Sequence, residues 1–226
     1  MDFNINNHGI IRIGGIEIWV TDTLISTWII MGVLIVFSII VRIKLRKAKK
    51  APKGLQNVVE YLVEAFDKFC RGIVGDKLMF LGNWFFTVFA FILLSNICGL
   101  FFMRNPTADW ATNFALALVT FVLIHAMGMK YRGRKHLKKL IEPHPLFLPL
   151  NIIGELARPI SLSFRLFGNV LAGMILLGLI YKPIFLRFLI PVPLHGFFDL
   201  FSGSIQTYVF CILSLSFISA AAETEA

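Results

Sequence analysis

One arginine, Arg165, stands in the middle of a long apolar stretch, within the sequence SFRLFGNVLAG (163–173). A guanidinium stays charged at physiological pH because its pKa exceeds about 12. If this stretch crosses a bilayer, a charge at its centre costs about 2.5–3.5 kcal/mol even on insertion-based scales. Arg165 follows Arg158 by seven residues and precedes Tyr181 by sixteen, too deep for easy contact with a membrane surface. We therefore interpret Arg165 as a functional charge.

No acidic residue of the same chain is clearly placed to neutralise Arg165. Glu155 precedes it by ten residues, about 15 Å along a helix, and can instead pair with Arg158 near an aqueous end. Asp199 is the only acid in the last apolar segment, seven residues before Gln206. We expect the partner of Arg165 to be a carboxylate of another chain, or a water-filled path beside the arginine.

Polar and small residues form one stripe on each of the last two apolar segments. At about 100° per residue, the first stripe comprises Glu155, Arg158, Leu162, Arg165, Asn169, Ala172, Gly173 and Leu176. The second comprises Asp199, Ser202, Gly203, Gln206 and Leu213. A short loop, 182–196, joins the segments, so we expect antiparallel helices with the stripes facing each other. Asn169 and Gln206 also fit ordinary interhelical hydrogen bonds, worth about 0.6 kcal/mol each in a bilayer.

Histidines and cysteines give no metal-binding pattern. His125 and His195 lie near expected helix ends, where surface or loop roles are favoured over proton relay. Cys70, Cys98 and Cys211 are far apart and lack metal-ligand spacing. We expect them to be small apolar fillers, with no metal and no cofactor.

The elements that hold these residues are expected to be membrane helices. The chain has 226 residues, of which 57% are hydrophobic and 15% charged, with a net charge of +9. Ten of the 22 basic residues fall within 42–77 and six within 130–139, which indicates cytoplasmic loops rather than a nucleic-acid surface. We expect a multi-pass protein with its N-terminus outside and its C-terminus inside.

The fold is predicted to be an all-α membrane protein, with the whole chain, 1–226, forming one membrane domain. About five membrane-embedded helices are expected, at 24–41, 78–103, 111–129, 143–181 and 197–221. Residues 55–74 are amphipathic and contain the possible pairs Glu64–Lys68 and Asp67–Arg71. This helix is expected either in the inner membrane interface or packed against the protein's own spans.

The segment 143–181 is too long to stand upright. As one straight helix it would measure about 58 Å, whereas the hydrocarbon core is about 30 Å thick. A strong tilt, or kinks at Pro159 and Gly168, must absorb the excess. The pair 143–181 and 197–221 is therefore predicted to be a strongly tilted or kinked hairpin.

These residues resemble subunit a of the rotary F-type ATP synthase. The resemblance is carried by NIIGELARPISLSFRLFGNVLAG (151–173) and SIQTYVFCILSLSFIS (204–219), and more weakly by LLSNICGLFF (93–102) and PTADWATNFALAL (106–118). It extends over nearly the whole chain, and the Arg-Leu-Phe-Gly-Asn core is its most specific part.

The resemblance implies a stator subunit that conducts ions against a rotating ring of c subunits. Arg165 would face the ring carboxylates, force ion release and block direct leakage between two half-channels, with Asn169 and Gln206 as polar neighbours. It also implies the peripheral-stalk subunit b and the rest of the ATP synthase as partners. The chain carries no phosphate-binding or nucleophile motif, so it is not expected to be an enzyme by itself.

The sequence departs from the family pattern at one place. Many relatives carry a glutamate nine positions after the arginine, where this chain has Met174, and Asp199 stands where relatives often have histidine or another polar group. We expect Asp199 to serve the outer half-channel and Glu155 the inner access path.

Several properties stay open at this stage. A bacterial cytoplasmic membrane is the expected location, with an organelle as the alternative. Whether H⁺ or Na⁺ is carried, the net direction of the machine, the ring size and the host are not readable from the chain. A self-sufficient secondary transporter would be expected to show internal repeats, and none is visible in the sequence.

Overall fold

A computed structural model describes residues 7–13, 16–46, 54–101, 104–138, 145–181 and 191–223. Parts of the expected organisation lie outside these ranges: the start of the segment 143–181, the end of 78–103, most of the loop 182–196 and the tail 224–226. Two strands, β1 (Asn7–Ile13) and β2 (Ile16–Thr21), pair in antiparallel fashion before the first helix. The sequence interpretation did not anticipate this hairpin.

Among the described residues, five helices are long and apolar enough to cross a membrane, which confirms the predicted class of an all-α membrane protein. They are α1 (Asp22–Leu45), α3 (Gly82–Ile97), α4 (Trp110–Arg132), α6 (Leu148–Ile180) and α8 (Gly203–Ala222). Helix α3 is extended by 3₁₀ turns at Asp76–Leu81 and Cys98–Phe101. Helix α8 continues from α7 (Pro191–His195) through a π-helical segment, Gly196–Ser202, so the last apolar helix begins before the expected residue 197.

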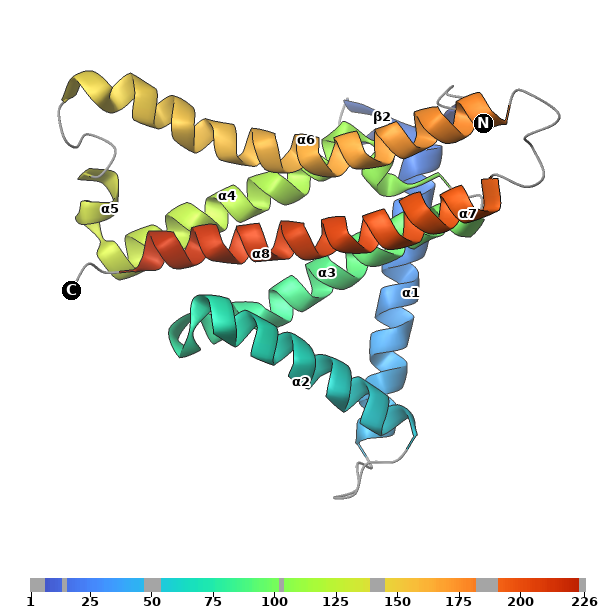
Figure 1. Ribbon diagram of the computed structural model, residues 1–226, viewed down its shortest axis with the longest axis horizontal. Coiled ribbons are helices and arrows are strands. Elements are labelled where there is room, and N and C mark those ends of the chain that lie inside the picture. The colour runs from blue at the N-terminus through green and yellow to red at the C-terminus, as the bar shows by residue number, and fades with distance from the viewer. Residues whose placement is uncertain are drawn as a thin grey trace.

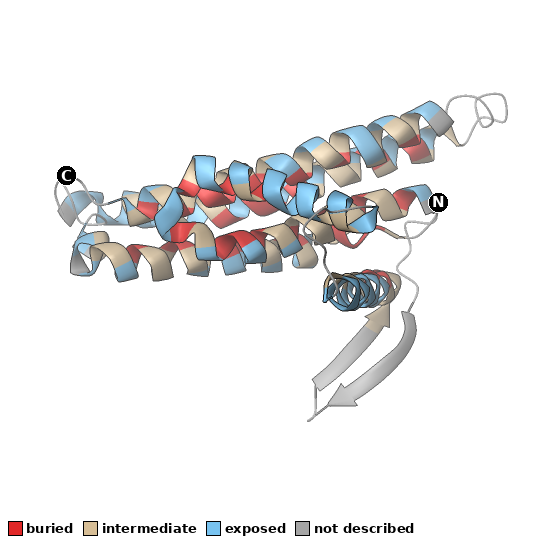
Figure 2. Cartoon of the chain, turned by 90° about the horizontal axis from the view of Figure 1, so that it is seen from below, coloured by how far each residue is buried: buried red, intermediate tan, exposed pale blue. Residues whose placement is uncertain are grey.

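The long hairpin runs across the direction of α1. In Figure 1 α1 is steep while α6 and α8 are nearly horizontal, and in Figure 2 α1 is seen end-on beside the same horizontal helices. These helices therefore cannot all stand parallel to one bilayer normal. Helix α6 is bowed but continuous over 33 residues, about 50 Å, with Pro159 buried inside it. The length of α6 therefore requires a tilt, and the helix is not broken at Pro159.

Polar side chains and glycines mark the helix ends. The Thr21 hydroxyl accepts a hydrogen bond from the Leu24 amide at 3.4 Å, which caps α1. The Asp109 carboxylate accepts from the Ala111 amide at 3.0 Å and caps α4. Helix α4 ends at Gly133, whose φ of 58° suits glycine, and the chain turns there into α5 (Arg134–Lys138). This turn brings α5 back against α4, where the His136 ring packs on Gly128.

The amphipathic helix α2 (Leu55–Val74) has the predicted bounds, and its second half packs against the spans. The Phe66 ring lies 5.2 Å from the Phe86 ring of α3, and the Phe69 ring lies 5.1 Å from the Tyr208 ring of α8. Tyr61, in the first half, is 70% exposed. The packing alternative is thus confirmed for the second half, while placement of the first half in the membrane interface stays a prediction.

One of the two expected ion pairs on α2 forms. Lys68 and Glu64 are 2.8 Å apart, and the hydrogen bond and charge of Lys68 lower the pKa of Glu64 below its ordinary value. Arg71 instead pairs with Asp76 at 2.8 Å, in the turn that follows the helix. The prediction of an Asp67–Arg71 pair was wrong, because the chain turns back after Gly75 and presents a closer acid.

A buried polar network joins α3, α4 and α8 beside the candidate site. The Asn96 amide donates to the Gly203 carbonyl at 3.0 Å, and the Thr107 hydroxyl donates to the Asn96 oxygen at 2.9 Å. The Asn113 amide donates to the Thr107 carbonyl at 2.7 Å. Buried polar groups without partners cost about 1–3 kcal/mol each, so this network holds the start of α8 in one position.

We predict that Gly203→Ala loosens this network. A Cβ at Gly203 would lie 2.8 Å from the Asn96 Cβ, so Asn96 must move and lose its hydrogen bond to the Gly203 carbonyl. The expected loss in stability is about 1–3 kcal/mol, measured as a lower midpoint of thermal unfolding in detergent. The control is Gly72→Ala on α2, where the added Cβ meets nothing within 4 Å. Equal midpoints for the two variants would contradict the assignment.

Candidate functional site

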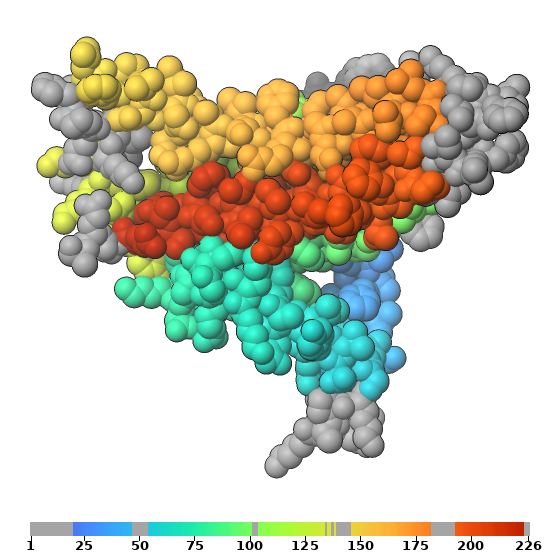
Figure 3. Space-filling view, in the orientation of Figure 1, coloured from blue at the N-terminus to red at the C-terminus, as the bar shows by residue number. Residues whose placement is uncertain are grey.

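Helices α6 and α8 lie side by side across one face of the molecule (Figure 3), antiparallel as predicted. The Ser202 hydroxyl donates to the Asn169 amide oxygen at 2.9 Å, and the Phe198 side chain packs directly against Gly173. In this antiparallel arrangement Gln206 lies opposite Arg165, one helical turn from the Asn169–Ser202 contact. The two polar stripes therefore meet along part of their length.

Arg165 lies exposed on α6, at the edge of the face that packs against α8. Within the part of the chain that the structure describes, Arg165 makes no hydrogen bond and no ion pair. The same exposed side of α6 carries small residues at helical spacing: Gly154, Ala157, Ser161, Gly168 and Ala172. Such residues allow another helix to approach closely. The guanidinium thus stands on a smooth surface that a second protein could contact.

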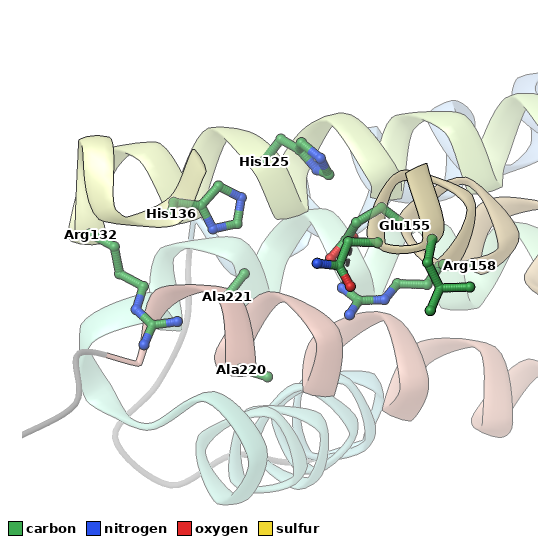
Figure 4. A pocket seen from close by; sticks show the side chains of 10 residues that line it. His125, Arg132, His136, Glu155, Arg158, Ala220 and Ala221 are labelled. Atoms are coloured by element: carbon green, nitrogen blue, oxygen red, sulfur yellow. Dashed lines mark ion pairs between the residues drawn. The ribbon is translucent and has the colours of Figure 1, made fainter. Parts of the chain in front are cut away.

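Two connected cavities lead along α6 to Arg165 from the end where α4 and α8 terminate. The first, about 300 Å³, is lined by His125, Arg132, His136, Glu155 and Arg158, among others (Figure 4). The second, about 240 Å³, is lined by Arg158, Ser161, Arg165, Leu213 and Phe217, among others. Because both are lined by Gly154 and Arg158, the two cavities adjoin and form a groove, with charged side chains in its first part and a mostly apolar lining where it ends at Arg165.

Glu155 and Arg158 form an ion pair inside this groove. The Arg158 Nη1 and Glu155 Oε2 are 2.9 Å apart, although the contact is not aligned as a hydrogen bond. The Arg158 guanidinium also lies 5.4 Å from the centre of the Phe217 ring of α8. Mutual neutralisation, one of the sequence alternatives for this pair, is therefore present.

On the other side of Arg165, Asp199 is the last member of a hydrogen-bonded chain. Its Oδ2 lies 2.7 Å from the His195 Nδ1, and the His195 Nε2 lies 3.1 Å from the Tyr181 hydroxyl. The Asp199 and His195 side chains are only 12% and 11% exposed. A small cavity of about 10 Å³, the lower limit for one water molecule, separates Asp199 from Asn169, Asn105 and Asn96.

The local backbone makes room for Asp199. It lies in the π-helical segment Gly196–Ser202, whose wider turn is typical of functional sites in helices. Opposite stands Gly99, where a Cβ would lie 2.8 Å from the Asp199 Oδ2. A larger residue at Gly99 would displace the carboxylate, so glycine is required there by the close approach.

The structure brings together some predicted site residues and leaves others apart. Asn169 bonds to Ser202 and not to Arg165, while the Gln206 Nε2 is buried without a hydrogen bond. Glu155 and Asp199 lie on opposite sides of Arg165 along α6. The described residues contain no group of three His, Cys, Asp or Glu side chains arranged for a metal.

Sequence reasoning missed two residues of the Tyr181–His195–Asp199 cluster. It favoured a loop or surface role for His195 and gave Tyr181 no role. The spacing of His195 and Asp199, four residues apart, was an available signal for contact on one helical face. Tyr181 lies fourteen residues before His195, across a loop, so no local pattern marked it.

Known proteins match the chain over most of its length. Residues 24–219 match the family model for the ATP synthase A chain. The chain is 38% identical to the sodium-ion-specific ATP synthase subunit a of Propionigenium modestum, with 88% of this chain and 73% of that protein covered. It is 36% identical to ATP synthase subunit a of Syntrophobacter fumaroxidans, with 87% and 82% covered. The chain with the exposed Arg165 on α6 therefore belongs to the ATP synthase subunit a family.

Proposed function

We propose that this chain is the ion-conducting stator subunit of a bacterial F-type ATP synthase, in which Arg165 controls ion transfer to carboxylates of a rotating c-ring. The observation that carries the proposal is the unpaired Arg165 guanidinium, set on an exposed face with small residues, between the groove and the small polar cavity beside Asp199. The ring is the expected source of the missing negative charge.

The chemistry at Arg165 follows from electrostatics. A cation within about 4–6 Å lowers the pKa of a carboxylate by 1–3 units, so a ring acid releases its ion when it reaches the arginine. The positive charge of Arg165 also repels a free cation and prevents its direct passage between the groove and the cavity beside Asp199. An ion must therefore travel on the ring between the two cavities.

Basic residues assign the groove and the small cavity beside Asp199 to opposite sides of the membrane. Lys130, Arg132 and their neighbours at the end of α4 are expected in the cytoplasm under the positive-inside rule. The groove beside Arg132 is then the inner half-channel and contains Glu155. The cluster of Asp199 becomes the outer half-channel, the N-terminus lies outside and the C-terminus inside.

The partners follow from the same proposal. The exposed face of α6 is expected to contact the c-ring, and subunit b and the other ATP synthase subunits are expected to complete the machine. ATP chemistry belongs to those partner chains. Copurification with an oligomer of small, two-span subunits would support this reading, whereas transport by the isolated chain in liposomes would favour a self-sufficient transporter.

We predict that Arg165→Lys nearly abolishes coupled transport. Lysine keeps the positive charge but lacks the planar fork that can contact a carboxylate through two parallel hydrogen bonds. The measurement is ATP-driven ion pumping by the complete complex in liposomes. The control is Arg71→Lys, since Arg71 forms its ion pair with Asp76 outside the groove. Normal pumping by Arg165→Lys would remove the basis of the proposal.

We predict that Asp199→Asn slows pumping by at least tenfold and alters its pH profile. The amide keeps the size of the side chain but cannot take up an ion, and Met174 offers no replacement carboxylate. The measurement is ATP-driven pumping across a range of pH. Unchanged rates and an unchanged profile would exclude Asp199 from the outer path.

We predict that Glu155→Gln slows transport several-fold without uncoupling it from ATP hydrolysis. Loss of the carboxylate leaves Arg158 unneutralised, so two positive charges face a cation in the groove. Raised salt should restore part of the rate, because it screens charges in water-filled paths. The control is Glu64→Gln, which breaks an exposed pair on α2. Equal rates for both variants would place Glu155 outside the ion path.

A further inference from the structure

We propose that Tyr181, His195 and Asp199 form a proton relay that loads the outer half-channel, so that this path admits protons and not sodium ions. The inference rests on the proposed function, because Asp199 is assigned there to the outer path. It adds two residues to that path, and it names the ion that the path carries. The carrying observation is a continuous chain of two hydrogen bonds that ends on a buried carboxylate.

The direction of each hydrogen bond follows if Asp199 is ionised and His195 is neutral. An ionised carboxylate only accepts, so the His195 Nδ1 carries the proton and donates it to the Asp199 Oδ2 at 2.7 Å. The neutral imidazole then has a lone pair on Nε2, which accepts from the Tyr181 hydroxyl at 3.1 Å. Both donors therefore point from the end of α6 toward Asp199.

This arrangement can move a proton without moving an ion through the protein. A proton from outer water joins the Tyr181 oxygen while the tyrosine's own proton passes to the His195 Nε2. The proton on Nδ1 passes to Asp199, which leaves a neutral carboxylic acid, a neutral imidazole and a neutral tyrosine. Asp199 then releases the proton toward the small cavity beside Asn169. The relay resets when the imidazole again carries its proton on Nδ1.

The surroundings of the relay favour protons over metal cations. The N–H of His195 is directed at the Asp199 Oδ2, so a sodium ion could use only the Oδ1 of this carboxylate as a ligand. The His195 side chain is buried and touches Tyr181 and Asp199, while the neutral Gly99 and Asn105 lie near the carboxylate on the side of α3. A cavity of about 10 Å³ leaves no space there for a hydrated sodium ion.

The decisive variant is His195→Asn, measured in the complete ATP synthase reconstituted in liposomes. Asparagine can keep an N–H donor near the Nδ1 position but has no second nitrogen to take up a proton. With pH and Na⁺ varied independently, the unaltered complex is expected to make ATP at a rate set by the proton gradient. His195→Asn should lower this rate at least tenfold. A normal rate in His195→Asn, or synthesis driven by a sodium gradient alone, would overturn the relay.

Chemical rescue separates a relay from a purely structural role. Added imidazole should restore part of the rate in His195→Ala, because it can enter the space and carry protons, but should restore nothing in Asp199→Asn. Absence of rescue in His195→Ala would count against the relay. Tyr181→Phe, which removes the first hydroxyl of the relay, should also lower the rate, whereas the control Tyr208→Phe should not, since Tyr208 packs against Phe69 away from the relay.

The outcome for Arg165→Lys in the same preparation distinguishes the two proposals. If Arg165→Lys stops synthesis while His195→Asn does not, the relay is wrong and the proposed function stands. If Arg165→Lys is as active as the unaltered complex, the proposed function fails, and with it the relay.

Discussion

The rest of this molecule depends on one constraint: the Arg165 guanidinium cannot lose its proton, yet it lies on a helix long and apolar enough to cross a membrane. The charge needs either water or a carboxylate, and no described residue of the chain supplies the carboxylate. Around Arg165 the chain supplies instead a groove on one side, a small polar cavity on the other, and an exposed face of small residues. Each feature makes sense as an accommodation of a charge whose partner belongs to another protein.

The length of α6 provides the second constraint, and it acts through the register with α8. A helix of about 50 Å cannot stand upright in about 30 Å of hydrocarbon, and a tilted helix presents a longer face to a neighbour. Along that face the Asn169–Ser202 hydrogen bond and the Gly173–Phe198 contact fix the position of α8. The buried network of Asn96 then ties the start of α8 to α3. Packing thus holds the groove and the Tyr181–His195–Asp199 cluster on opposite sides of Arg165.

Most of the architecture could be predicted because periodicity and length are local properties of the chain. The apolar segments, the bounds of α2 and the antiparallel stripes of α6 and α8 all follow from spacing. The β1–β2 hairpin had a signal as well, since Gly14-Gly15 separates two alternating segments, but it was missed. The π-helical segment has no comparable signal. It contains Asp199 and lies beside the close approaches at Gly203 and Gly99, which involve residues far away in the sequence.

The residues that sequence reasoning missed are those whose partners lie far along the chain. Tyr181 contacts His195, fourteen residues further along the chain, and His136 joins the cavity beside Glu155 and Arg158 only because the chain turns at Gly133. Such contacts depend on how the helices are placed, which spacing within one helix does not determine. Arg165 was identifiable because a charge in an apolar segment is informative wherever its neighbours lie.

The spacing of the two acids explains why Arg165 remains available. Asp199 lies near Gly173, eight residues or about 12 Å along α6 from Arg165, and Glu155 lies about 15 Å away on the other side. At an effective dielectric constant of about 20, opposite charges 12 Å apart attract by about 1.4 kcal/mol, against about 4 kcal/mol at 4 Å. A carboxylate that approaches Arg165 closely from a neighbouring protein therefore outcompetes either acid of the chain. An acid of this chain placed one turn closer would attract Arg165 more strongly and, under the proposed function, would compete with the ring carboxylates for it.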